Sequence, residues 1–236
     1  ILSGGFADTL CQNTTAYFGR FSLSWDGGGT PETRLRDWLD PNDTSIRTLA
    51  SIENPTTNDF VLMQGRITTP RGEGIGGVDI VVVENNQTAS TDIAGSYFLD
   101  DLLFGENYVV GPVKDYNYTN GVTTFDLVQI RGHILGTSPF TSAYQLITAD
   151  VNDSDSVSTF DIVQCQKLVL NIDNAFENTT SWRFVSSGTN LEAIPVETYD
   201  YAVPNAIQIN GITSDIQGDF IGVKIGDVNG SANPQE

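Results

Sequence analysis

The chain carries one pattern twice, DYNYTNGVTTFDLVQ at residues 115–129 and DVNDSDSVSTFDIVQ at residues 150–164, with a constant offset of 35 residues. After the shared Thr-Phe-Asp triplet, apolar residues recur three and four positions apart, which is the spacing of an amphipathic helix. The sequence therefore predicts two copies of one unit, a loop followed by a helix, and internal repetition of this kind is a strong guide to the fold.

Each loop places oxygen-bearing residues at alternate positions, the arrangement with which an EF-hand loop binds a hard cation such as Ca²⁺. The predicted ligands are Asp115, Asn117, Thr119, the Gly121 carbonyl and Asp126 in the first loop, and Asp150, Asn152, Ser154, the Ser156 carbonyl and Asp161 in the second. The fifth position is Thr or Ser, so each site has one charge fewer than a loop with Asp at that position. The pattern predicts two calcium ions.

A shorter stretch near the C-terminus, Asp227-Val228-Asn229-Gly230-Ser231, repeats the opening of the second loop. A partial third loop, a ligand of a further ion and a simple C-terminal turn are the alternatives for it.

With Asp at the twelfth position and a single helix after each loop, the pair resembles the type I dockerin over about residues 112–172. Cohesin-binding dockerins have small hydroxyl pairs at loop positions 10 and 11, where this chain has Thr124-Phe125 and Thr159-Phe160. Phe125 and Phe160 are therefore candidate partner contacts. We expect them to be exposed if the module docks onto a partner, and buried if its role is purely structural.

Four short apolar runs separated by turn residues, at 61–67, 78–83, 95–99 and 108–110, predict a small antiparallel sandwich. Together with Gly74-Ile75-Gly76-Gly77-Val78 and Thr91-Asp92, they resemble the carboxypeptidase regulatory-like domain, a prealbumin-like module that usually serves as a stalk or spacer. Further strands are expected at 182–185, 206–209 and 220–225.

The expected fold class is mainly β with a small α region, built as tandem β-sandwich modules plus a dockerin-like pair. The predicted organisation is an N-terminal segment at 1–60 that ends a β-sandwich, the regulatory-like sandwich at 61–112, the dockerin-like module at 113–172, and a β-rich segment at 173–236 that packs on the dockerin-like module.

Charge and cysteine content exclude several classes of protein. Eleven Lys and Arg against 30 Asp and Glu give a net charge of −19, which repels nucleic acid and anionic membranes. No apolar run is long enough for a membrane span. Cys11 and Cys165 are the only cysteines, too few for a disulfide framework or a thiolate zinc site. Cys165 is expected as a buried free thiol, with a bridge to Cys11 as the alternative.

No enzyme is expected, because the sequence contains no Gly-x-Ser-x-Gly, His-Glu-x-x-His or phosphate-loop motif and has His133 as its only histidine. Four features occur together over about residues 61–232: the regulatory-like sandwich, the two Thr-Phe-Asp loops, Ser181-Trp182-Arg183-Phe184, and Lys224-Ile225-Gly226-Asp227-Val228-Asn229. This combination is similar to modules of large surface proteins that gliding Gram-negative bacteria export by the type IX route. That resemblance implies an extracellular structural module of an adhesin, stalk or filament.

Its partners would be other subunits or domains of the parent protein, including copies of itself. A dockerin-type docking module that attaches a secreted protein to a partner is the alternative. The same bacteria O-glycosylate Asp-Ser/Thr followed by an aliphatic residue, which makes Thr9 in Asp8-Thr9-Leu10 a glycosylation candidate. Asp155-Ser156-Val157 also matches that pattern, inside the second loop.

Overall fold

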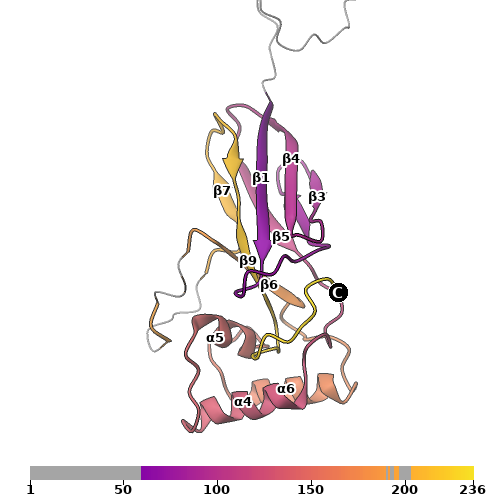
Figure 1. The fold of residues 1–236 in the computed structure, drawn as a ribbon, viewed down its shortest axis with the longest axis vertical. Coiled ribbons are helices and arrows are strands. Elements are labelled where there is room, and N and C mark those ends of the chain that lie inside the picture. Colours follow the sequence, from indigo (N-terminus) through magenta and orange to yellow (C-terminus); the bar gives the residue numbers. More distant parts are fainter. Residues whose placement is uncertain (1–59, 190, 192–193, 197–202) are drawn as a thin grey trace, which may run out of the picture. The chain divides into compact units, whose positions relative to one another are not determined.

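A computed structural model describes residues 60–189, 191, 194–196 and 203–236. The predicted N-terminal segment, apart from Phe60, and the glycosylation candidate Thr9 lie outside the described residues. The described part is mainly β with a small α region, as expected (Figure 1). Its strands are β1 (Phe60–Thr68), β2 (Asp79–Val82), β3 (Thr88–Ser90), β4 (Ser96–Leu103), β5 (Tyr108–Val113), β6 (Trp182–Ser186), β7 (Ile207–Ile209), β8 (Ile216–Gln217) and β9 (Phe220–Lys224), and its helices are α4 (Thr124–Ile134), α5 (Ala143–Ala149) and α6 (Thr159–Val169).

The strands form two sheets. One has the order β4-β1-β9-β6, with β8 also paired to β1, and the other has the order β3-β2-β5-β7. Strand β1 pairs antiparallel with β4 and parallel with β9, so the last strand of the described chain lies beside the first. Strands β7, β8 and β9 thus complete both sheets, and the boundary expected at residue 112 does not separate them from the sandwich.

A hydrophobic core fills the space between the sheets, and strand alternation explains its composition. Along β1, alternate residues face inward, and Met63 and Ile67 are fully buried. Ile80 on β2 and Phe220 on β9 enter the same core from the two sheets. The four strands predicted between residues 61 and 110 are confirmed by this arrangement.

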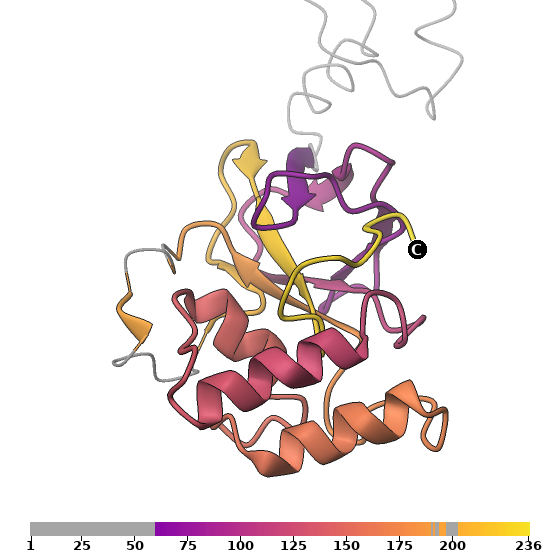
Figure 2. The same cartoon turned by 60° about the horizontal axis from the view of Figure 1, so that its bottom comes forward.

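Helices α4 and α6 are the two helices predicted from the repeat. Each begins with a capping box, in which the side chain of Thr123 or Ser158 accepts a backbone N–H of the first turn, and the carboxylate of the Asp three residues later accepts the N–H of that Thr or Ser. The two helices contact each other and lie side by side below the sheets (Figures 1 and 2). Helix α5, between them in sequence, was not predicted.

A second hydrophobic core joins the helices to the sheet. On β6, Phe184 faces the sandwich core, whereas the next residue, Val185, faces the helices. Strand β9 does the same with Phe220 and Val223. The segment after residue 173 therefore packs both on the helical part and within the sandwich, because its strands bury both faces.

Candidate functional site

The second loop, residues 150–161, folds around two carboxylates that are fully buried, Asp150 and Asp161. Asp150 accepts the backbone N–H groups of Ser154 (2.9 Å, on Oδ1) and Asp155 (2.9 Å, on Oδ2). Asp161 is the third residue of α6 and accepts hydrogen bonds from Val151 N (3.0 Å) and Ser158 N (2.8 Å). The loop thus brings its first and twelfth positions together.

Between these two carboxylates in sequence stands Asn152, whose Oδ1 atom is buried without a hydrogen-bond partner. A buried polar oxygen without a hydrogen-bond partner costs free energy, and an ion bound at that oxygen is one arrangement that removes the cost. Neither Asp150 nor Asp161 forms a salt bridge within the described residues. Burial raises the pKa of Asp150, and the nearby charge of Asp161 adds to that rise. A bound cation would pair with the two carboxylates, give Asn152 Oδ1 a partner and lower the pKa of Asp150.

The first loop is arranged differently at its start. Asp115 Oδ1 accepts hydrogen bonds from Ser181 N (2.9 Å), just before β6, and from the hydroxyl of Tyr118. The N–H of Asn120 donates to the carbonyl oxygen of Asn117 (3.1 Å). Among the described residues, the one backbone N–H that donates to the Asp115 carboxylate is that of Ser181, outside the loop. The structure therefore does not place Asp115 as it places Asp150.

The end of the first loop does match the second. Asp126 is fully buried as the third residue of α4 and closes the capping box with Thr123 N (2.9 Å). Its other oxygen, Oδ1, accepts the side-chain amide of Asn229 (2.7 Å), from the C-terminal segment. Gly121 has φ +75°, and a Cβ there would lie 2.6 Å from Ala232. Two positions of the first loop therefore pack against residues 227–232.

Asp227 in that segment is buried, with 3% of its surface exposed, and accepts the N–H groups of Ser231 (3.1 Å) and Ala232 (2.7 Å). Desolvation raises its pKa, and the charge of Asp126 raises it further. Sequence reasoning left this stretch open between a turn and a ligand set. The signal for it was present, since Asp-Val-Asn-x-Ser occurs at both 150–154 and 227–231.

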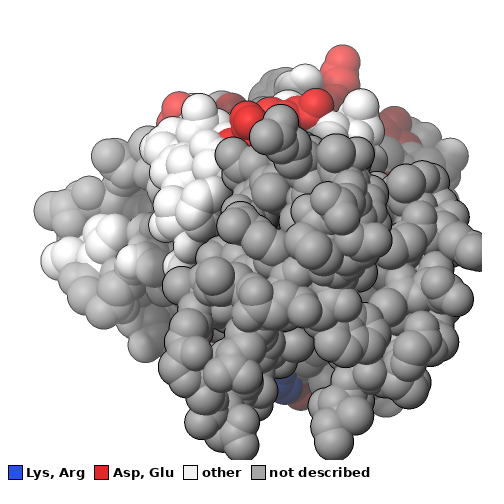
Figure 3. Space-filling view, turned by 90° about the horizontal axis from the view of Figure 1, so that it is seen from above, with Lys and Arg blue, Asp and Glu red and all other residues white. Residues whose placement is uncertain are grey.

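Few of the side chains that could bind a metal ion in these loops are acidic. Within the described residues, no three His, Cys, Asp or Glu side chains gather as a metal group. Each cluster instead combines two carboxylates with amide, hydroxyl and carbonyl oxygens, which are the ligands that Ca²⁺ takes in proteins. The described part of the surface in Figure 3 shows acidic side chains along one rim, in keeping with the net charge of −19.

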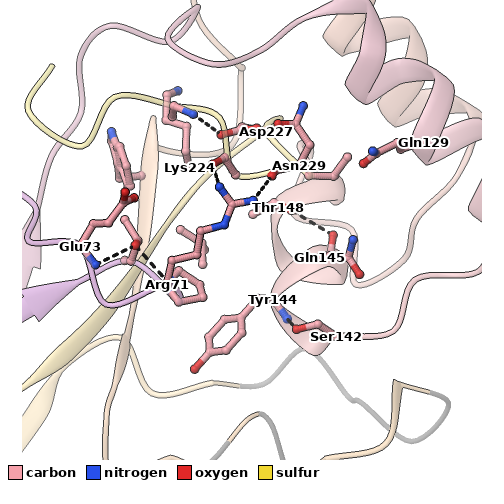
Figure 4. Close-up of a pocket in the computed structure, with 18 residues that line it drawn as sticks. Arg71, Glu73, Gln129, Ser142, Tyr144, Gln145, Thr148, Lys224, Asp227 and Asn229 are labelled. Carbon is pink, nitrogen blue, oxygen red and sulfur yellow. Dashed lines mark hydrogen bonds between the residues drawn. The ribbon is translucent and has the colours of Figure 1, made fainter.

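A pocket of about 380 Å³ lies beside the C-terminal segment, between the β1–β2 loop, β9 and helix α5 (Figure 4). Its two cationic side chains, Arg71 and Lys224, are already engaged. Arg71 donates to the carbonyl oxygens of Asn229 and Gly230 (2.7 Å each). Lys224 donates to Tyr118 O (2.9 Å) and Ser181 O (3.3 Å), and burial lowers its pKa to about 7. These contacts hold the fold together around the pocket.

The two helices present apolar side chains to solvent at equivalent positions of the repeat. The exposed residues are Phe125 (58%), Val128, Leu135, Phe160 (63%), Val163 and Leu170, which we call the helix-pair surface. Phe125 and Phe160 are therefore exposed, which is the outcome expected of a docking module and not that expected of a purely structural one. Cys165, in contrast, is fully buried, and burial raises the pKa of its thiol to about 12. Cys11 lies outside the described residues.

No protein-family model matches the chain. No helix in the described ranges is long and apolar enough to cross a membrane.

Proposed function

We propose that the chain is a non-catalytic, calcium-stabilised structural module of an extracellular surface protein, such as an adhesin, stalk or filament subunit. In this proposal its sheets form a carboxypeptidase regulatory-like sandwich, and its loops and helices form a dockerin-like pair that binds two calcium ions. Its partners are other domains or subunits of the parent protein.

The observation that carries the proposal is the second loop. Asp150 and Asp161 are fully buried without a cationic partner in the described structure, and Asn152 Oδ1 between them has no hydrogen bond. Burying ionised carboxylates is costly unless a cation pairs with them. An ion there would tie residue 150 to the first turn of α6, and so stabilise a helical part that is small for independent folding.

Hydrogen exchange of residues 150–161 tests this proposal. We expect calcium at about 100 times its dissociation constant to slow local exchange by roughly a hundredfold relative to EGTA, because ligand binding stabilises the closed loop by about 2.7 kcal/mol. Magnesium should give much less protection, since it demands a tighter octahedral shell. Asp161→Asn should remove the gain. Equal protection in calcium and EGTA would contradict the proposal.

A dockerin-type docking module is the second candidate, and the exposure of the helix-pair surface favours it. Apolar side chains that face solvent at equivalent repeat positions are typical of interaction sites. In this alternative, Phe125 and Phe160 are the anchors that attach the secreted protein to a partner protein.

Site-specific photo-crosslinking in cells that make the parent protein separates the two candidates. A photoreactive residue at Phe160 is expected to form one discrete adduct with another protein if the module docks, and Val163→Asp should abolish it. Phe98 on β4, which is 66% exposed, is the matched control position and should give no such adduct. Absence of any adduct from both Phe125 and Phe160 would argue against docking.

A further inference from the structure

We propose that the calcium ion of the first loop is held by a composite site, whose first half is Asp227–Ser231 and whose second half is Gly121–Asp126. The ion would thereby fasten the C-terminal segment across the fold. This inference rests on the proposed function, and it replaces three of the ligands expected from sequence with residues more than one hundred positions away.

Residues 227–231 match residues 150–154 in sequence and in hydrogen bonding. Asp227-Val-Asn-Gly-Ser and Asp150-Val-Asn-Asp-Ser agree at four of five positions. In both, the Asp carboxylate accepts the N–H groups of the fifth and sixth residues, one on each oxygen. In both, the Ser hydroxyl lies 3.4 Å from the same carboxylate oxygen. The C-terminal segment therefore has the conformation of the first half of the second loop.

The first loop supplies the second half of the site, from the seventh position to the twelfth. In the second loop, the Ser154 hydroxyl lies 3.3 Å from the carbonyl oxygen of Ser156, the seventh position. In the C-terminal segment, the Ser231 hydroxyl lies 3.2 Å from the carbonyl oxygen of Gly121, which is the seventh position of the first loop. The contact between the fifth and seventh positions, which lies within one continuous segment in the second loop, is thus made here between two separate segments.

The twelfth position completes the match. Asp161 Oδ1 accepts a backbone N–H from the first half of its own loop, at Val151 (3.0 Å). Asp126 Oδ1 accepts one from the C-terminal segment, at Asn229 (3.3 Å), together with the Asn229 side-chain amide. The contacts of Asp126, Asp227, Ser231 and Gly121 thus resemble those of Asp161, Asp150, Ser154 and Ser156. One difference is that Asp126 accepts the N–H of the third residue of the C-terminal segment, Asn229, where Asp161 accepts that of the second residue of its own loop, Val151.

Two of the three displaced side chains, Asp115 and Asn117, have other partners. Asp115 is engaged by Ser181 N and the Tyr118 hydroxyl, and the Asn117 amide donates to Glu236. Within the described residues, Asp126 and Asp227 form no salt bridge, although Lys224 lies close enough for the charge of Asp227 to act on it. The Lys224 amine donates to carbonyl oxygens instead. The two buried carboxylates therefore share a need for a cation.

Occupancy of this site would have a mechanical consequence, because the C-terminal segment also contacts the sandwich. Arg71 holds the carbonyl oxygens of Asn229 and Gly230 (Figure 4). Further along, Pro234 O accepts Gly76 N (3.2 Å), and the Gln235 side chain donates to Gly74 O (2.8 Å). A bound ion would link helix α4 to the sandwich through this segment, whereas the second site lies within one continuous loop.

Native mass spectrometry in calcium tests the inference with two isosteric variants. The unmodified chain is expected to bind two ions, Asp227→Asn one, and Asp115→Asn two. Loss of an ion by Asp115→Asn, or retention of both by Asp227→Asn, would overturn the composite site. No ion on the unmodified chain would instead refute the proposed function, so the two failures are distinguishable.

A gain-of-function pair protects the test against misfolding. Ser231→Asp adds a carboxylate at the fifth position of the composite site and should tighten the first ion roughly tenfold, because ligand charge sets affinity. Thr119→Asp, at the fifth position of the contiguous loop, should leave the affinity of that ion unchanged. The reverse result would also overturn the inference.

Discussion

Removal of both calcium ions with EGTA is expected to lower the melting temperature of the chain by about 11–33 °C. Each ion at 100 to 1,000 times its dissociation constant adds about 2.7–4.1 kcal/mol to the free energy of unfolding. For a domain of this size, 1 kcal/mol corresponds to about 2–4 °C. The effect should be large because the ions bridge segments that contribute to the helical core.

The variant Asp161→Ala should lose about half of this calcium-dependent shift, since the second site cannot close without its twelfth position. Asp173→Ala is the matched control, because it also removes one carboxylate. Asp173 is exposed and pairs with Lys167 at 3.2 Å, and such surface pairs contribute at most about 1 kcal/mol. A melting temperature that is the same in calcium and in EGTA would show that neither loop is a structural ion site.

Truncation of Leu168 on helix α6 is expected to destabilise the chain by about 2–5 kcal/mol. Leu168 is fully buried in the helical core, and Leu→Ala substitutions at such positions lose both hydrophobic contacts and packing. Leu170→Ala, two residues later, removes the same atoms from a side chain that is 59% exposed, and should cost about 0.5 kcal/mol or less.

Urea denaturation in saturating calcium measures this difference as a shift of the midpoint with an unchanged slope. Equal costs at the two positions would mean that α6 does not pack as described.

The local elements of this fold were predictable, because their signals are local. A short apolar run bounded by turn residues marked β1, and apolar spacing after the Thr-Phe-Asp triplets marked α4 and α6. Helix α5 was missed since its seven residues are too short for a period to emerge. Strands β6, β7 and β9 were expected, but their membership of the sandwich sheets depends on non-local pairing that no local pattern encodes.

In the candidate site, too, the residues of one continuous segment could be predicted from their spacing, whereas those brought together by tertiary packing could not. Spacing within the second loop pointed to Asp150 and Asp161, and both are buried in one continuous segment, where Asp161 accepts Val151 N and Asp150 accepts Ser154 N. In the first loop the same spacing pointed to Asp115, which tertiary contacts draw toward Ser181 instead. The C-terminal Asp-Val-Asn-Gly-Ser stretch carried the missing signal, but only packing brings Asp227 within reach of the Asp126 cluster.

Because the helix-pair surface is exposed, a calcium-stabilised structural role and a docking role are compatible. A module can be stabilised by ions and still present Phe125 and Phe160 to a partner, because the buried and exposed faces of α4 and α6 are separate. Docking would then add to the structural role.

Calorimetric titration of the chain with calcium is the most direct test of the central claim. We predict binding of two ions per chain, with a much weaker response to magnesium. No heat of binding and no change in melting at millimolar calcium would contradict the account, and the buried carboxylates at Asp126, Asp150, Asp161 and Asp227 would then need another explanation.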